Sequence, residues 1–79
     1  MNVQEKVRAH IINSFLSADE AMMFRDDDDL LTILNSLQIL RMVIDLERTF
    51  SIKIDNSELT AENLGSVERI ARLITSHVA

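Results

Sequence analysis

A chain of 79 residues without cysteine has to be held together by packing alone, because it can form neither a disulfide nor a thiolate metal site. Hydrophobic residues make up 47% of the chain, proline is absent and glycine occurs once, which favours helices over a sheet. The net charge of −5 disfavours nucleic acids and anionic membranes as partners, and no apolar run has the length of a membrane span. The N-terminus lacks the basic-then-apolar order of a signal peptide. We therefore expect a single all-α domain over residues 1–79, located in the cytoplasm.

The first predicted helix covers residues 3–17, where apolar side chains recur about every four residues. Residues 18–35 have no such period and are predicted to form a long loop, which in so small a domain is either functional or packed by its own apolar side chains. The side chains expected to supply that packing are Met23, Phe24, Leu30, Leu31 and Leu34. We interpret the cluster Met22-Met23-Phe24 as closing the core beneath the loop, with a partner-binding surface as the less favoured alternative.

Four consecutive aspartates, Asp26 to Asp29, stand in this predicted loop. An EF-hand that starts at Asp26 requires glycine at its sixth position and glutamate at its twelfth, and this chain has Leu31 and Leu37 there. The run is therefore interpreted as a solvated acidic loop. His10 and His77 have no cysteine or suitably spaced carboxylate nearby in the sequence, so no metal site is predicted.

The second predicted helix begins at Ser36 and ends at Phe50 or Ser51, and its wide apolar arc is typical of a central helix. Residues 52–54 are predicted to form a short extended link. A single helical turn, capped by Asn56 or Ser57, is expected to follow and to run through residues 59–61. The last helix is predicted to start after Gly65, with Ser66 as its cap, and to continue to Val78. Three long helices and one short helix result.

Ser36 stands at the start of the central helix, where unpaired N–H groups and a partial positive charge favour a phosphate. Two interpretations stay open at this point: an ordinary N-cap serine, or a serine that carries a phosphate ester. A catalytic nucleophile is not expected, because the chain has no Gly-x-Ser-x-Gly elbow and no histidine evidently placed beside Ser36. We therefore predict that the protein is not an enzyme.

Taken together, these features resemble the acyl carrier protein family over roughly residues 4–78. The resemblance is carried by the aspartate-rich loop, by Leu34-Asn35-Ser36-Leu37, and by Leu-Glu-x-x-Phe-x-Ile-x-Ile over residues 46–54. A short segment and a closing apolar helix follow at the expected distance. The implied fold is an acyl-carrier-like four-helix bundle with three long helices and one short helix.

By this resemblance, Ser36 is the attachment point of 4′-phosphopantetheine, flanked by Asn35 and Leu37 in the motif. A phosphopantetheinyl transferase would move the group from coenzyme A onto the serine hydroxyl, and the thiol of the arm would carry acyl groups as thioesters. The implied partners are that transferase, an acyl-loading enzyme, and a ketosynthase or acyltransferase. The apolar face near Leu40, Ile44 and Leu59 would shelter a bound acyl chain.

Two departures from the family pattern are informative. The family usually has aspartate before the serine, where it helps to hold the metal ion of the transferase, whereas this chain has Asn35. Carriers of unusual polyketide extender units share Asn-Ser-Leu, which favours a specialised carrier of secondary metabolism over the fatty-acid carrier. The second departure is charge, since the helix is expected to present partner-binding residues of mixed character instead of the usual acidic set. These residues are Gln38, Arg41, Asp45 and Arg48.

Other functions stay open on the sequence alone. One is a peptidyl or aryl carrier of a nonribosomal pathway, against which the acidity and the Leu-Glu-x-x-Phe pattern weigh. Another is a small helical interaction module with an unmodified serine. The initial methionine and the absence of tag residues favour a free-standing carrier over one excised from a larger synthase. We expect it to be a monomer.

Overall fold

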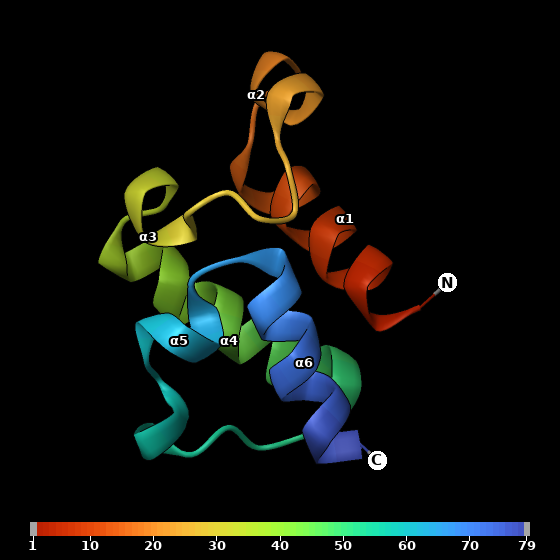
Figure 1. Ribbon diagram of the computed structural model, residues 1–79, viewed down its shortest axis with the longest axis vertical. Coiled ribbons are helices and arrows are strands. Elements are labelled where there is room, and N and C mark those ends of the chain that lie inside the picture. The colour runs from red at the N-terminus through yellow and green to blue at the C-terminus, as the bar shows by residue number, and fades with distance from the viewer. Residues whose placement is uncertain (1, 79) are drawn as a thin grey trace.

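The computed structural model describes residues 2–78, and the regular secondary structure within that range is entirely helical (Figure 1). The all-α prediction is therefore confirmed. Three helices are long: α1 (Val3–Phe15), α4 (Ser36–Phe50) and α6 (Val67–Val78). The connections contain the short helices α2 (Ala18–Met23), α3 (Leu30–Ile33) and α5 (Ala61–Leu64), with a 3₁₀ turn, η1 (Asn56–Glu58), before α5. No helix within residues 2–78 is long and apolar enough to cross a bilayer.

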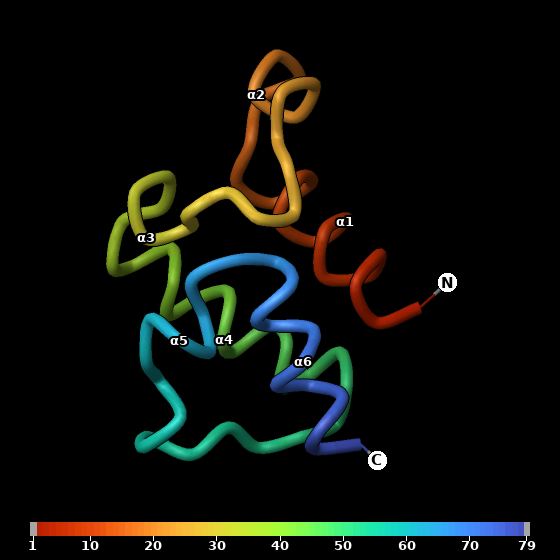
Figure 2. Tube along the Cα trace, in the orientation of Figure 1, coloured from red at the N-terminus to blue at the C-terminus, as the bar shows by residue number. Residues whose placement is uncertain are grey.

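The long helices pack around one aliphatic core. α6 packs against α1 and α5, α1 also contacts α4, and α3 contacts α5. Figures 1 and 2 show α2 projecting from the body of the molecule at one end of the long axis, away from α4 and α6. Each long helix contributes fully buried side chains, and α6 contributes the most. The largest of them are Ile11, Met42, Leu46, Ile70 and Ile74, and Leu30 of α3 is fully buried with them.

Polar side chains fix where the long helices begin. The Asn2 side chain accepts a hydrogen bond from the Glu5 N–H at 2.8 Å and so caps α1. As predicted, Ser66 caps α6, since its Oγ accepts from the Arg69 N–H at 3.2 Å. α4 ends at Phe50, and its C-cap Ser51 adopts the left-handed conformation (φ 54°) that is usual for glycine or asparagine.

Gly65 lies in the short connection between α5 and α6 and contacts the segment that leads to α4. A Cβ on this residue would lie 2.5 Å from the carbonyl oxygen of Ala61, so only glycine fits without a backbone shift. The carbonyl oxygen of Gly65 accepts a hydrogen bond from the Leu30 N–H at 2.8 Å. This bond ties the start of α3 to the end of α5, and α3 in turn leads directly into Ser36.

The prediction of a long loop over residues 18–35 is wrong, because α2 and α3 occupy much of it and the first helix ends at Phe15 instead of residue 17. α2 begins with a reciprocal capping box between Ser17 and Glu20. Phe24 is buried as expected, but Met22 is 84% exposed and Met23 is 80% exposed. The interpretation of the two methionines as core residues is therefore wrong. The turn of α2 carries them away from the body, and only Phe24 reaches inward.

The prediction for the short helical turn needs a similar correction. Neither Asn56 nor Ser57 caps it, because the segment divides into η1 and α5. The Asp55 N–H donates to Glu58 Oε1 at 2.9 Å at the start of η1, and Thr60 Oγ1 accepts from the Asn63 N–H at 3.3 Å at the start of α5. The change of direction between the two pieces places Leu59 at the surface, 41% exposed.

The four aspartates lie at the surface, as expected for an acidic run, but most of them also hold local structure. Asp26 Oδ1 accepts from Arg8 Nη1 at 2.8 Å and Asp26 Oδ2 accepts from Gln4 Nε2 at 2.7 Å, which ties the segment to α1. Asp28 accepts from the Arg25 N–H, and Asp29 caps α3. The solvated-loop interpretation is thus incomplete: these carboxylates fix the path of the chain towards α4.

Replacing Asp26 with asparagine is expected to destabilise the domain at neutral pH by about 1 kcal/mol, as is usual for a partly exposed charged hydrogen bond. Burial raises the pKa of Asp26, but the hydrogen bonds from Gln4 and Arg8 and the Arg8 charge outweigh it, so the pKa lies below the ordinary value of 3.8. The stabilisation is then fully present above pH 3.8 and is lost as the pH falls through the lower folded-state pKa.

Urea denaturation of wild type and Asp26→Asn between pH 7 and pH 2 measures this difference. The matched control is Asp27→Asn, because Asp27 is exposed and makes only a 3.4 Å contact with Arg25. A difference between wild type and Asp26→Asn that stays constant down to the lowest pH would contradict the assignment.

Candidate functional site

Ser36 is the first residue of α4, and its neighbour Asn35 is the cap. Asn35 Oδ1 accepts from the Gln38 N–H at 2.8 Å, and the Asn35 N–H donates to Gln38 Oε1 at 3.0 Å. The interpretation of Ser36 as the N-cap is therefore wrong, because the reciprocal pair of Asn35 and Gln38 already closes the helix end. The Ser36 side chain is exposed, and its hydroxyl makes no hydrogen bond with any residue that the structure describes.

The first turn of α4 leaves backbone donors available beside that hydroxyl. The N–H of Gln38 is bonded to the Asn35 side chain and the N–H of Ile39 to the Asn35 carbonyl at 3.0 Å. The N–H groups of Ser36 and Leu37, at the first two helical positions, have no acceptor within the helix. An anion esterified to Ser36 would therefore lie next to free donors at the positive end of a 15-residue helix.

Large exposed hydrophobic side chains gather around the start of α4. They come from α3, from the outer face of α4 and from the residue that follows η1, and their exposure runs from 41% to 75%. The members of this apolar surface are Leu31, Leu37, Leu40, Ile44 and Leu59. Clustered exposure of this kind indicates a binding surface, because single exposed leucines are ordinary but a contiguous group is not.

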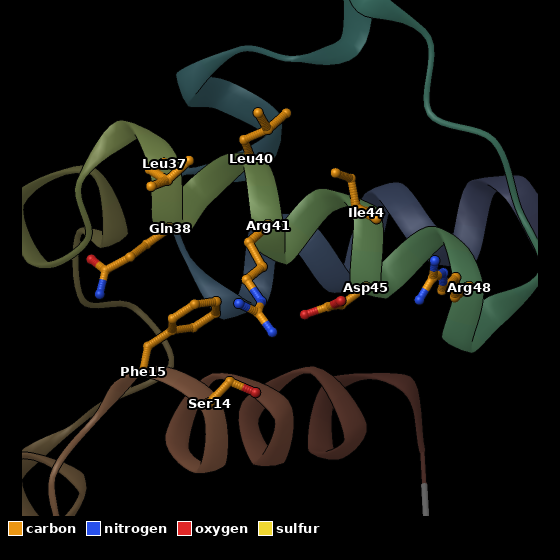
Figure 3. Close-up of a pocket in the computed structure, with 9 residues that line it drawn as sticks. All are labelled: Ser14, Phe15, Leu37, Gln38, Leu40, Arg41, Ile44, Asp45 and Arg48. Atoms are coloured by element: carbon orange, nitrogen blue, oxygen red, sulfur yellow. The ribbon is translucent and has the colours of Figure 1, made fainter.

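Two grooves border the apolar surface. One, of about 310 Å³, lies between α4 and α5; Ser36, Leu40 and Leu59 line it, and its walls are mostly apolar. The other, of about 780 Å³, lies between the end of α1 and the length of α4 (Figure 3). In Figure 3, Leu37, Leu40 and Ile44 point to one side of α4, whereas Arg41 points towards Phe15 of α1.

The four predicted partner-binding residues all line this second groove, but the structure gives them different roles. Gln38 is committed to the capping box with Asn35. Asp45 is half-buried, and its Oδ2 lies 3.3 Å from His10 Nε2 on α1, within ion-pair distance although without hydrogen-bond geometry. Arg41 and Arg48 are exposed and make no ion pair within residues 2–78.

The other acidic residue of α4, Glu47, is also engaged within the molecule. Glu47 Oε2 accepts from the Ile54 N–H at 2.8 Å and so fixes the link that leaves the helix. Asp45 and Glu47 have partners within the molecule, whereas Arg41 and Arg48 have none within residues 2–78, so the exposed charged side chains of α4 are the two arginines. They are positive, although the net charge of the whole chain is −5.

Sequence reasoning missed part of the site. Leu31 was expected to pack inward, but it is 43% exposed and lines the groove beside Ser36, together with Thr60 and Ala61 of the α5 start. The cap of α3 at Asp29 could have predicted that Leu31 is exposed. A helical turn that begins at Leu30 puts Leu30 and Leu34 on the same, inward face, and Leu31 then points away from it. Within residues 2–78, no group of three or more potential metal-ligating side chains is formed.

The fold and the site define a small helical domain that presents a free serine hydroxyl at the start of its central helix. Comparison with known proteins adds no family to this description: no family model matches the chain, and no curated protein matches it significantly. Any functional assignment therefore rests on the geometry around Ser36 and on the sequence resemblance.

Proposed function

We propose that the protein is an acyl carrier protein that holds acyl groups as thioesters on a 4′-phosphopantetheine arm attached to Ser36. The observation that carries the proposal is the hydroxyl of Ser36, which is exposed and free of hydrogen bonds while Asn35 caps the helix. A serine that served only as the N-cap would accept a hydrogen bond from a backbone N–H of the first turn. α1, α4 and α6 would then be the three long helices of the carrier bundle, and α5 its short helix.

The residues around Ser36 fit such an arm. A phosphodiester on Ser36 would be stabilised by the helix N-terminus by about 0.3–1 kcal/mol. When bound, the arm would supply a terminal thiol that carries the acyl group. The chain itself would supply the attachment point, an apolar surface for the enzymes that meet the thioester, and a groove of about 310 Å³ beside Ser36.

That groove is a fitting shelter for the first part of an acyl chain. Leu40 and Leu59, which the sequence assigned to this role, line it from opposite sides, whereas Ile44 lines the larger groove towards α1. Asn35-Ser36-Leu37 favours a cargo of the polyketide extender-unit type. A carrier of amino or aryl acids would use the same serine, and thioester loading with each class of acid distinguishes them.

Intact mass spectrometry tests the carrier proposal directly. The protein is incubated with coenzyme A, Mg²⁺ and a broad-specificity phosphopantetheinyl transferase, and the expected result is a gain of one phosphopantetheine. A chain that gains nothing with several such transferases would leave the interaction module with an unmodified serine as the better proposal. The exposed apolar surface favours that second candidate independently of any modification.

Reversing the charge of Arg41 is expected to slow the reaction with the cognate acyl-loading enzyme. Arg41 borders the apolar surface and has no internal partner, so it is available to steer an acidic patch of that enzyme. Arg41→Glu should lower kcat/KM by on the order of tenfold at low salt, and the difference should shrink as salt increases. The matched control is Arg72→Glu, the same charge change on α6. Unchanged rates with Arg41→Glu would remove the support for an acidic partner.

A further inference from the structure

Met22 and Met23 are the most exposed large hydrophobic side chains within residues 2–78, at 84% and 80%. They stand next to each other on α2, which projects from the body of the molecule (Figures 1 and 2). Neither contributes to the core. Their exposure to water is therefore unfavourable, and no packing within the molecule offsets it. A pair of flexible, polarizable side chains in such a place is well suited to fill a pocket on another molecule.

The base of α2 holds this pair in a fixed position. The Ser17 N–H donates to Glu20 Oε1 at 2.8 Å and the Glu20 N–H donates to Ser17 Oγ at 3.2 Å. At the other end, the buried Phe24 has its carbonyl oxygen bonded to Arg8 Nη2 at 2.7 Å, and the Arg8 guanidinium lies 5.1 Å from its ring centroid. A helix anchored at both ends presents its methionines without having to be ordered first, which lowers the entropic cost of binding.

The charge beside the methionines is negative. Asp19 precedes Met22 by three residues and Met23 by four, so the three share a face of the helix, and Glu20 lies beside them. α2 itself contains no cation. The next cation along the chain, Arg25, is in contact with Asp27 at 3.4 Å, and Arg8 is paired with Asp26 at 2.8 Å.

We propose that α2 is a docking element that inserts Met22 and Met23 into an apolar pocket rimmed by lysine or arginine on a partner protein. Asp19 and Glu20 would pair with the basic rim. The charge argues for this occupant over an anionic bilayer, which the same carboxylates would repel. A second copy of this chain carries Arg41 and Arg48 beside its own apolar groove, and the concentration dependence in the test distinguishes it. This docking element lies on a different helix from Ser36 and does not depend on the carrier function.

The test uses protein with ¹³C-labelled methionine methyl groups and, as probe, a synthetic amphipathic helical peptide of leucine and lysine. The methyl signals of Met22 and Met23 are expected to shift on titration, while that of the buried Met42 stays in place. Met22→Ser/Met23→Ser should weaken the binding by about tenfold or more. Both residues are exposed, so thermal unfolding should be unchanged; Val78→Ser, at another exposed apolar position, is the matched control.

The charge part of the proposal has its own variant. Asp19→Asn/Glu20→Gln removes both negative charges but keeps an oxygen acceptor at residue 20 for the Ser17 N–H. It should weaken binding several-fold, and a peptide with glutamate in place of lysine should not bind. Binding of the leucine–lysine peptide by Met22→Ser/Met23→Ser with the wild-type affinity would overturn the proposal. So would methyl shifts caused by phosphatidylglycerol vesicles but not by the peptide, or by raising the protein concentration alone.

Discussion

Under the carrier proposal, replacing Ser36 with alanine is expected to abolish modification by coenzyme A and a phosphopantetheinyl transferase while leaving the stability of the domain unchanged. The modification requires a hydroxyl at this position, whereas the fold does not use it, because the Ser36 side chain makes no hydrogen bond within the described residues. Alanine is also the better helix former. The free energy of unfolding should therefore change by no more than about 0.5 kcal/mol. Intact mass and urea denaturation of the same preparations measure the two effects.

The neighbouring Asn35 supplies the matched comparison. Asn35→Ala removes the side chain that accepts the Gln38 N–H, and loss of a cap costs about 1 kcal/mol. Asn35→Asp keeps an acceptor at the same place and, by the family resemblance, restores the residue that helps to hold the transferase's metal ion. It should retain full stability and be modified faster than wild type. If Ser36→Ala is as destabilising as Asn35→Ala, or is still modified, the separation of cap and attachment point is wrong.

The long helices were predictable because each has several turns over which the apolar period repeats. The bounds of α4, Ser36–Phe50, follow from its apolar arc and from the change of pattern at residues 52–54. The short helices of the 18–35 segment carry no such period, since four to six residues give little more than one turn. Only their caps mark them: Ser17 with Glu20 three residues later is a capping box that was readable in the sequence.

The position of Ser36 at a helix start was also predictable, but the absence of a hydrogen bond to its hydroxyl was not. Asn35 and Ser36 are both good caps, and the choice depends on Gln38, which stands three residues after Asn35 and completes a box with it. The charge that α4 presents depends on contacts distant in sequence. Asp45 faces His10 of α1, and Glu47 faces the backbone of Ile54. No periodicity within α4 shows which of its charged residues are engaged internally.

Leucines on opposite faces of α4 are expected to respond in opposite ways to truncation. Leu46 is 1% exposed in the core between the long helices, whereas Leu37 is 75% exposed beside Ser36. Leu46→Ala should cost about 2–5 kcal/mol, from lost burial and from the cavity it leaves. Small domains have only about 5–15 kcal/mol of stability in all, so this single change should lower the urea midpoint markedly. Leu37→Ala should shift it by about 0.5 kcal/mol or less.

The functional effects should be reversed. Under the carrier proposal, Leu37 belongs to the surface that a transferase meets on its way to the Ser36 hydroxyl, so Leu37→Ala should slow modification without loosening the fold. Leu46→Ala should be modified at the wild-type rate under conditions where it stays folded, because its side chain does not reach that surface. Rates of modification at matched folded fractions measure the difference. A strongly destabilised Leu37→Ala would mean that the outer face of α4 is packed in solution, and the apolar surface would then belong to the fold and not to a partner.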